Sequence, residues 1–182
     1  MVSGRLFALA ASIIAPVQDA AFDPVGGYRI AAYRGVVPGP PPGVAQIDAA
    51  GVAALGDRAL LIDVVPAEGG VRDPATGAWR LARPAVSIPH AHWFPEAGRG
   101  MPDPAIERWF LDGVRTLAAR HPRAPIIVFC LADCWMSWNA ALRLRRAGYT
   151  QVRWFAEGSD GWRDLGRSLV PVAPYRASVR RR

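Results

Sequence analysis

The sequence predicts an α/β protein with an open parallel sheet and helices on both of its faces. Residues 59–65 and 125–129 are apolar on both faces, as is typical of strands in the middle of a parallel sheet. Segments with helical spacing of apolar residues alternate with the predicted strands, which favours crossover connections between parallel neighbours. The length of 182 residues suits one domain with extensions.

The N-terminus has the pattern of an export signal. Arg5 precedes an apolar run over residues 6–15, and Pro16 ends that run. The run is far shorter than the ~20 residues of a membrane span. We therefore predict that residues 1–21 are a signal peptide, and that the mature protein is periplasmic with no membrane span. A buried N-terminal helix and an uncleaved anchor are the alternatives. In an oxidising compartment, a cysteine pair would rest as a disulfide.

Residues 22–47 form an N-terminal extension ahead of the main predicted domain, residues 48–170. Within the extension, residues 28–33 alternate well enough for a short strand. The proline-rich residues 38–43 then form a stiff connector, because proline fits neither a helix interior nor a central strand.

The main domain opens with a helix and a buried strand. Asp48 can cap a helix over residues 49–55, which Gly56 ends. The apolar strand at residues 59–65 follows and carries Asp63 near its carboxyl end. Catalytic groups in parallel sheets lie at such strand ends, so Asp63 is a candidate site residue.

A long excursion follows this strand. Residues 66–84 are rich in Gly, Pro and Asp, and we predict a small hairpin around Thr76 and Gly77. The length of the excursion is typical of a functional flap. We predict a short strand at residues 85–89 and a loop at residues 90–95.

The loop contains two histidines, His90 and His92. A metal site is disfavoured because no third ligand has a recognisable spacing and His121 is distant in the sequence. We expect instead that the two histidines line the mouth of the active site, since His90 follows a predicted strand.

The second half of the chain continues the alternation. Asp103 and Pro104 form the start signature of a helix, and apolar residues recur at helical spacing as far as His121. The remaining predicted elements are a strand at residues 125–129, a helix at 133–147, a strand at 151–155 and a short helix at 158–165.

The chain ends in a basic tail, residues 171–182. All 22 basic residues of the whole chain are arginines, and the net charge of the chain is +7. The tail carries a cluster of them, whereas the others are scattered and lack an aromatic-interleaved strand motif. We therefore predict a solvated tail and no nucleic-acid partner.

Both cysteines lie at the junction of a predicted strand and helix. Cys130 ends the strand, and Cys134 follows four residues later with Asp133 and Trp135 beside it. The free N–H groups at a helix start favour a thiolate, which is the reactive form of cysteine. Cys130 as one more buried apolar residue is the alternative, but a core needs no second cysteine in a loop.

Five segments in this order resemble the landmarks of a rhodanese-like domain over residues 48–170. The segments are LIDV at residues 61–64, SIPHA at 87–91, IVFC at 127–130, AGYTQV at 147–152 and EG…W at 157–162. The resemblance implies an open parallel α/β fold with Cys130 in the position of the catalytic cysteine. The loop after Cys130 lacks the family's usual arginine and glycine, so the resemblance does not imply ordinary thiosulfate sulfurtransferase activity.

Residues 130–141, CLADCWMSWNAA, are similar to the CXXXCW-motif family associated with pyrroloquinoline-quinone-dependent catabolism. That resemblance implies an exported protein linked to periplasmic quinoprotein alcohol oxidation. A quinoprotein dehydrogenase or a cytochrome c would be its partner. No cofactor bound to the chain itself is predicted.

The leading functional hypothesis is dithiol–disulfide chemistry. Cys130 is the predicted reactive thiol and Cys134 its resolving partner, with Asp133 opposing thiolate formation and Trp135 covering the pair. If both cysteines lie on one helical turn, closing the bond requires that turn to unwind.

Two alternatives remain open at this stage. Cys130 could carry a persulfide as a sulfurtransferase does. The chain could instead be a non-catalytic accessory module that binds through exposed aromatic side chains, for which the candidates are Trp93, Phe94, Trp135 and Trp138.

Overall fold

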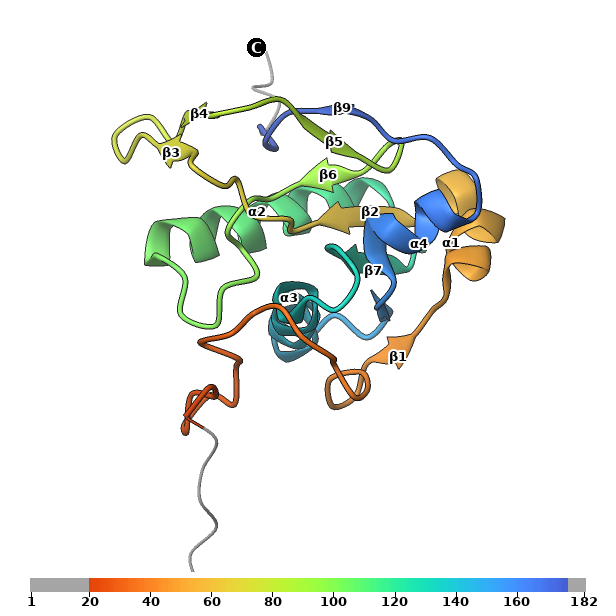
Figure 1. The fold of residues 1–182 in the computed structure, drawn as a ribbon, viewed down its shortest axis with the longest axis horizontal. Helices are drawn as coiled ribbons and strands as arrows, with labels where there is room; N and C mark the ends of the chain where they lie inside the picture. Colours follow the sequence, from red (N-terminus) through yellow and green to blue (C-terminus); the bar gives the residue numbers. More distant parts are fainter. Residues whose placement is uncertain (1–19, 177–182) are drawn as a thin grey trace, which may run out of the picture.

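The computed structural model describes residues 20–176, which form a five-stranded parallel sheet flanked by helices (Figure 1). The strand order across the sheet is β1-β8-β7-β2-β6. The strands are β1 (Ala45–Gln46), β2 (Leu60–Asp63), β6 (His92–Trp93), β7 (Ile126–Phe129) and β8 (Val152–Phe155). The predicted α/β class with a parallel sheet is confirmed.

The central strands β2 and β7 are buried at every position, and their side chains pack into two separate hydrophobic cores, one on each face of the sheet. Leu60 and Ile62 point to one face, while Leu61 points to the other. Burial of one such side chain contributes about 1.5–3 kcal/mol. The helices over the first face are α2 (Pro104–Arg120) and α3 (Trp135–Arg146), and those over the second are α1 (Ala49–Leu55) and α4 (Gly158–Asp164).

Side-chain caps fix the starts of two helices where the sequence predicts them. The Asp48 carboxylate accepts a hydrogen bond from the Gly51 N–H at 2.8 Å, ahead of α1. The Asp103 carboxylate accepts one from the Ala105 N–H at 2.6 Å, ahead of α2. Each cap satisfies an N–H that the helix leaves unpaired, so local sequence alone determines these boundaries.

The edge of the sheet differs from the prediction. The predicted strand at residues 85–89 is β5 (Ala85–Ser87), but it pairs antiparallel with β9 (Val170–Val172) outside the main sheet. The edge strand of the main sheet is β6, which is anchored by a hydrogen bond from the Phe94 N–H to the Asp63 carbonyl at 2.8 Å. Because β6 begins after His90 and runs parallel to β2, His90 lies at the amino end of the sheet, not at its carboxyl end.

The predicted hairpin in the excursion is confirmed. Strands β3 (Val71–Arg72) and β4 (Trp79–Arg80) pair antiparallel around a turn that contains Gly77 in the left-handed region. The predicted strand at residues 28–33 is wrong, because Ala32 adopts a left-handed φ of 47° and the extension makes only isolated bridges there.

The described part of the C-terminal tail packs on the domain and is not solvated along its length. The Tyr175 ring stacks on Phe94 at 4.7 Å, and its N–H donates to the Trp93 carbonyl at 2.7 Å. Most of the predicted signal peptide, residues 1–19 of 1–21, lies outside the described residues. The last three arginines of the tail, in residues 177–182, also lie outside them. Over residues 20–176, no helix has the length and apolar character needed to span a membrane.

The N-terminal extension is fastened to α3 through one side-chain amide. The fully buried Asn139 accepts a hydrogen bond from the Arg29 N–H at 2.9 Å and donates to the Arg29 carbonyl at 2.8 Å. It also donates to the Gly98 carbonyl at 3.0 Å. One buried residue therefore joins the extension, α3 and the segment before α2.

We expect Asn139→Ala to lower the free energy of unfolding by about 2–4 kcal/mol, because it leaves buried backbone groups without partners. Urea unfolding followed by circular dichroism measures the change. Arg108→Ala, an exposed substitution on α2, is the control and should stay within about 0.5 kcal/mol of wild type. Equal losses for the two variants would contradict the fastening role of Asn139.

Candidate functional site

The two thiols lie next to each other where the chain leaves the sheet. Cys130 directly follows β7, and Cys134 directly precedes α3. Their sulfur atoms are 2.7 Å apart, and the side chains are 0% and 4% exposed. The two residues are the only cysteines of the chain. The structure therefore brings the predicted pair together.

The start of α4 holds the loop between the cysteines. The Ser159 N–H donates to the Cys130 carbonyl at 2.9 Å, and the Asp160 carboxylate accepts from the Ala132 N–H at 2.9 Å. Gly158 permits this approach, because a Cβ at that position would lie 2.1 Å from the Cys130 carbonyl oxygen. Gly158 also has a φ of +55°, which disfavours any other residue.

The predicted need to unwind α3 is wrong. The helix was expected to begin at Asp133, but it begins at Trp135, and Cys134 is its N-cap with extended backbone angles. Asp133 takes a left-handed φ of 50°, which reverses the chain before the helix. The cysteines therefore do not share a helical turn, and the turn can stay intact while the sulfurs meet.

The surroundings of the two thiols shift their pKa values in opposite directions. When Cys134 is ionised, the Cys130 thiol donates a hydrogen bond to it, which lowers the pKa of Cys134 from 9.0 to about 7 against the opposing effect of burial. The N–H of Met136 and the positive charge of Arg34 act in the same direction. Burial, the Cys134 sulfur and the Asp63 carboxylate raise the pKa of Cys130 well above its usual value.

This asymmetry favours the opposite assignment of roles from the one that the sequence suggests. The sequence suggests Cys130 as the reactive thiolate, but Cys130 is the more deeply buried and lies close to a carboxylate. Cys134 lies at the amino end of α3 and beside an arginine. The environment therefore favours the anion on Cys134.

Asp63 lies beneath the thiols and not in their cavity. Its carboxylate is 1% exposed, accepts from the Ser87 hydroxyl at 2.5 Å and accepts from the Val65 N–H at 2.7 Å. Burial raises its pKa from 3.8 to about 6, although both hydrogen bonds favour the ionised form. When ionised, this carboxylate acts on Cys130 through space.

A cavity of about 400 Å³ opens onto both thiols. The N-terminal extension contributes Tyr33 and Arg34 to its lining, and the excursion contributes residues 66–70. Glu96 and Arg99 also line it and form an ion pair at 2.6 Å. The excursion therefore reaches the site, as its length suggests.

Arg34 is a site residue that sequence reasoning missed. A backbone bridge joins it to Cys134, and hydrogen bonds join the residues on each side of it to the loop. The N–H of Gly35 donates to the Asp133 carbonyl at 2.9 Å, and the Trp135 N–H donates to the Tyr33 carbonyl at 2.8 Å. No local pattern marks Arg34, because its contact spans about a hundred residues of sequence.

Two predicted site residues lie elsewhere. Asp133 is exposed and does not line the thiol cavity. Trp135 does not line that cavity either, and packs edge-on against Phe22 at 5.3 Å and Trp138 at 5.4 Å. Residues from the extension and from α3 take the covering role that the sequence suggests for Trp135.

The aromatic residues proposed for a binding surface are not exposed. Trp93 is 3% exposed, Phe94 0% and Trp135 7%, and Trp138 is half-buried. The hypothesis of an accessory module that binds through these side chains loses its proposed surface.

The prediction that His90 and His92 line the mouth of the thiol site is wrong. They line a separate cavity near the amino end of β2, because the edge strand begins after His90. Within residues 20–176, no group of three or more His, Cys, Asp or Glu side chains is placed to hold a metal ion.

The fold and the site together define an α/β protein with a buried pair of adjacent thiols at the carboxyl edge of a parallel sheet. No family model, curated protein or solved structure matches the chain. The geometry and electrostatics of the thiols are therefore the features that bear on its function.

We expect Asp63→Asn to stabilise the reduced protein at pH 7.5 but not at pH 4. The folded pKa of about 6 lies above the ordinary 3.8, so Asp63 favours folding below pH 4 and loses that contribution as the pH rises through 6. The variant should gain about 2–3 kcal/mol in free energy of unfolding at pH 7.5. Urea unfolding at both pH values tests this.

Asp112→Asn, an exposed change on α2, is the matched control. Its effect should be within about 0.5 kcal/mol at each pH. A gain for Asp63→Asn that is independent of pH would refute the assignment of a buried, ionising carboxylate.

Proposed function

We propose that the protein is a thiol–disulfide redox protein in which Cys134 provides the attacking thiolate and Cys130 is the resolving thiol. The contact of the two sulfurs at 2.7 Å, in surroundings that favour the anion on one and the thiol on the other, carries this proposal. A resolving thiol needs a protonated resting state and a short path to its partner, and Cys130 has both.

The reaction balances with a disulfide as the co-reactant. The Cys134 thiolate attacks one sulfur of the substrate, forming a mixed disulfide and breaking the substrate S–S bond. Cys130 then gives its proton to the released thiolate and attacks the Cys134 Sγ. The second substrate sulfur leaves as a thiolate that takes a proton from water. The protein loses two electrons and the substrate gains them, and the reverse sequence oxidises a dithiol.

The fold supports a finer proposal about family. Cys130 follows a central strand of a five-stranded parallel sheet, as the resemblance to rhodanese-like domains implies. With the similarity of residues 130–141 to the CXXXCW motif, we extend the proposal to an exported, periplasmic protein of that family. Its partner would be a quinoprotein dehydrogenase or a cytochrome c of periplasmic alcohol oxidation, linked to pyrroloquinoline quinone without binding it here.

Alkylation of the reduced full-length chain by iodoacetamide tests the assignment of roles. We expect Cys134 to be modified first, with a rate that rises through an apparent pKa of about 7, since the thiolate is the reacting form. Peptide mass spectrometry identifies the modified residue. Cys130→Ala should move the apparent pKa of Cys134 upward, because it removes the hydrogen bond that contributes most to lowering it.

Two substitutions of arginine, one beside the thiols and one far from them, give a matched test and control for this experiment. Arg34→Gln should slow alkylation at pH 7 by roughly two- to fivefold, the effect of one nearby exposed charge. Arg108→Gln, on α2, should leave the rate unchanged. First modification of Cys130, or a rate that is flat from pH 6 to 8, would refute the proposed roles.

One observation favours sulfur transfer as a second candidate function. Arg34 and Arg99 line the thiol cavity, so cationic groups that the loop lacks come from other segments. A thiolate that attacks the outer sulfur of an anionic donor forms a persulfide and releases the rest of the donor as an anion. The sequence places this persulfide on Cys130, whereas the electrostatics favour Cys134.

Mass spectrometry of the reduced protein after incubation with thiosulfate decides between the two candidates. Sulfur transfer adds roughly 32 Da to one cysteine. The redox proposal instead expects an unmodified dithiol with thiosulfate, and with a disulfide oxidant a loss of roughly 2 Da, the mass of two hydrogen atoms. A stable persulfide in wild type that Cys134→Ser abolishes would favour the second function.

A further inference from the structure

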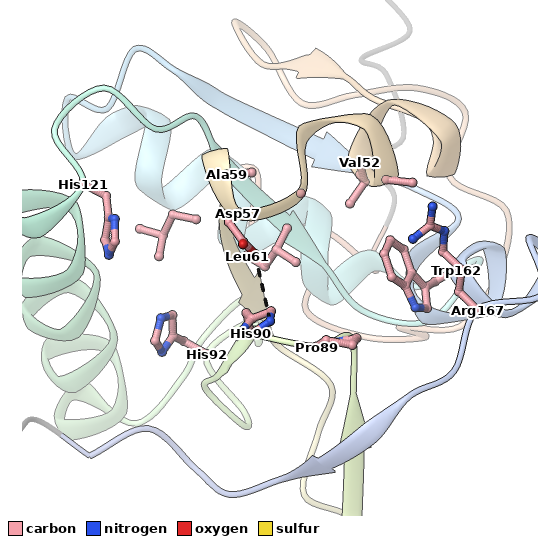
Figure 2. A pocket seen from close by; sticks show the side chains of 13 residues that line it. Val52, Asp57, Ala59, Leu61, Pro89, His90, His92, His121, Trp162 and Arg167 are labelled. Atoms are coloured by element: carbon pink, nitrogen blue, oxygen red, sulfur yellow. Dashed lines mark ion pairs between the residues drawn. The ribbon is translucent and has the colours of Figure 1, made fainter.

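A second cavity, of about 460 Å³, lies away from the thiols near the amino end of β2 (Figure 2). Its lining comes from α1, from the turn and strand that follow it, from the segment before β6, and from the ends of α2 and α4. None of these residues lines the thiol cavity. The volume is within the range of small-molecule sites, which is roughly 300–1,000 Å³.

The floor and one wall of the cavity are apolar. Val52 and Leu61 belong to the core on this face of the sheet, and the indole of Trp162 forms a wall beside them (Figure 2). The Arg167 guanidinium lies over the Trp162 ring, 4.9 Å from its centroid. This arrangement offers a flat apolar surface with a cation at one end.

The other end of the cavity carries imidazoles. All three histidines of the chain line it, and Figure 2 places His92 and His121 on the same side of the cavity, opposite Trp162 and Arg167. His90 lies between these ends and pairs with Asp57 at 4.0 Å. Asp57 is the one acidic residue in the lining, and its side chain is 92% exposed.

The charges around His92 favour an anion. Burial lowers the pKa of His92, and the electrostatic effects of His121 and Arg120 lower it further. A carboxylate beside the ring would accept a hydrogen bond from an imidazole N–H and favour the protonated ring. Asp57 is directed to His90 and does not supply that anion.

We propose that this cavity binds a small aromatic carboxylate, with its ring against Leu61 and Trp162 and its carboxylate at His92 and His121. The indole and the apolar floor select a flat body, and the two imidazoles select the acid over the neutral analogue. The proposal is independent of the thiol chemistry, because no residue is shared between the two cavities.

Histidine resonances of the full-length protein give a direct test, since the chain has only three histidines and all line this cavity. Titration with 2-naphthoate should shift the imidazole Hε1 signals in a saturable way and raise the pKa of His92. Other charged or titratable groups act on the His92 ring or line the cavity, so variants of each are titrated under the same conditions. These groups are Asp57, His90, His121, Arg120 and Arg167. The neutral 2-naphthol should bind roughly tenfold more weakly or worse.

Three variants complete the design. His92→Asn and His121→Asn should each weaken 2-naphthoate roughly tenfold while leaving 2-naphthol unchanged. Ala53→Phe, which fills the cavity from α1, should abolish binding of both, with Arg108→Gln as the control. If His92→Asn does not fold, the exposed His121 decides the case. Equal binding of the acid and the neutral compound, or no shift at millimolar 2-naphthoate, would overturn the proposal.

Discussion

The parallel pairing of β2 with β7 is the constraint on which the site depends. Its register sets Asp63 opposite Phe129, and the Val64 N–H donates to the Phe129 carbonyl at 3.0 Å. Cys130 therefore leaves the sheet close to a buried carboxylate. Water cannot screen that charge effectively, so it acts on the nearest ionisable group. The difference between the two thiols thus begins with the pairing of two strands.

The rest of the site depends on segments that are remote in the sequence. The extension supplies Arg34 through a backbone bridge, and α4 positions the loop through the close approach of Gly158 to Cys130. The extension is also held by the aromatic cluster of Phe22, Trp135 and Trp138. The residues after Cys134 consequently have two roles. They begin α3 next to the thiols, and their tryptophans hold the N-terminal extension that covers the thiols.

Local rules predicted what local interactions determine. The caps at Asp48 and Asp103 set the starts of α1 and α2, and the continuous apolar runs identified β2 and β7. The two-residue edge strand β6 escaped prediction, because so short a strand leaves no periodic signal and owes its position to β2. That error moved His90 to the wrong end of the sheet. The place of Arg34 and the electrostatic difference between the thiols depend on tertiary contacts, which no pattern of spacing reports.

The contact that holds the extension on α3 also affects access to the thiols. The Asn139 contact with Arg29 joins residues 110 apart, whereas the cysteines are 4 apart. Closing a long loop costs more conformational entropy than closing a short one, so local contacts form earlier. The contact that holds the extension is therefore the costlier of the two to form. Release of the extension at Asn139 would open the thiol cavity and leave the two sulfurs beside each other.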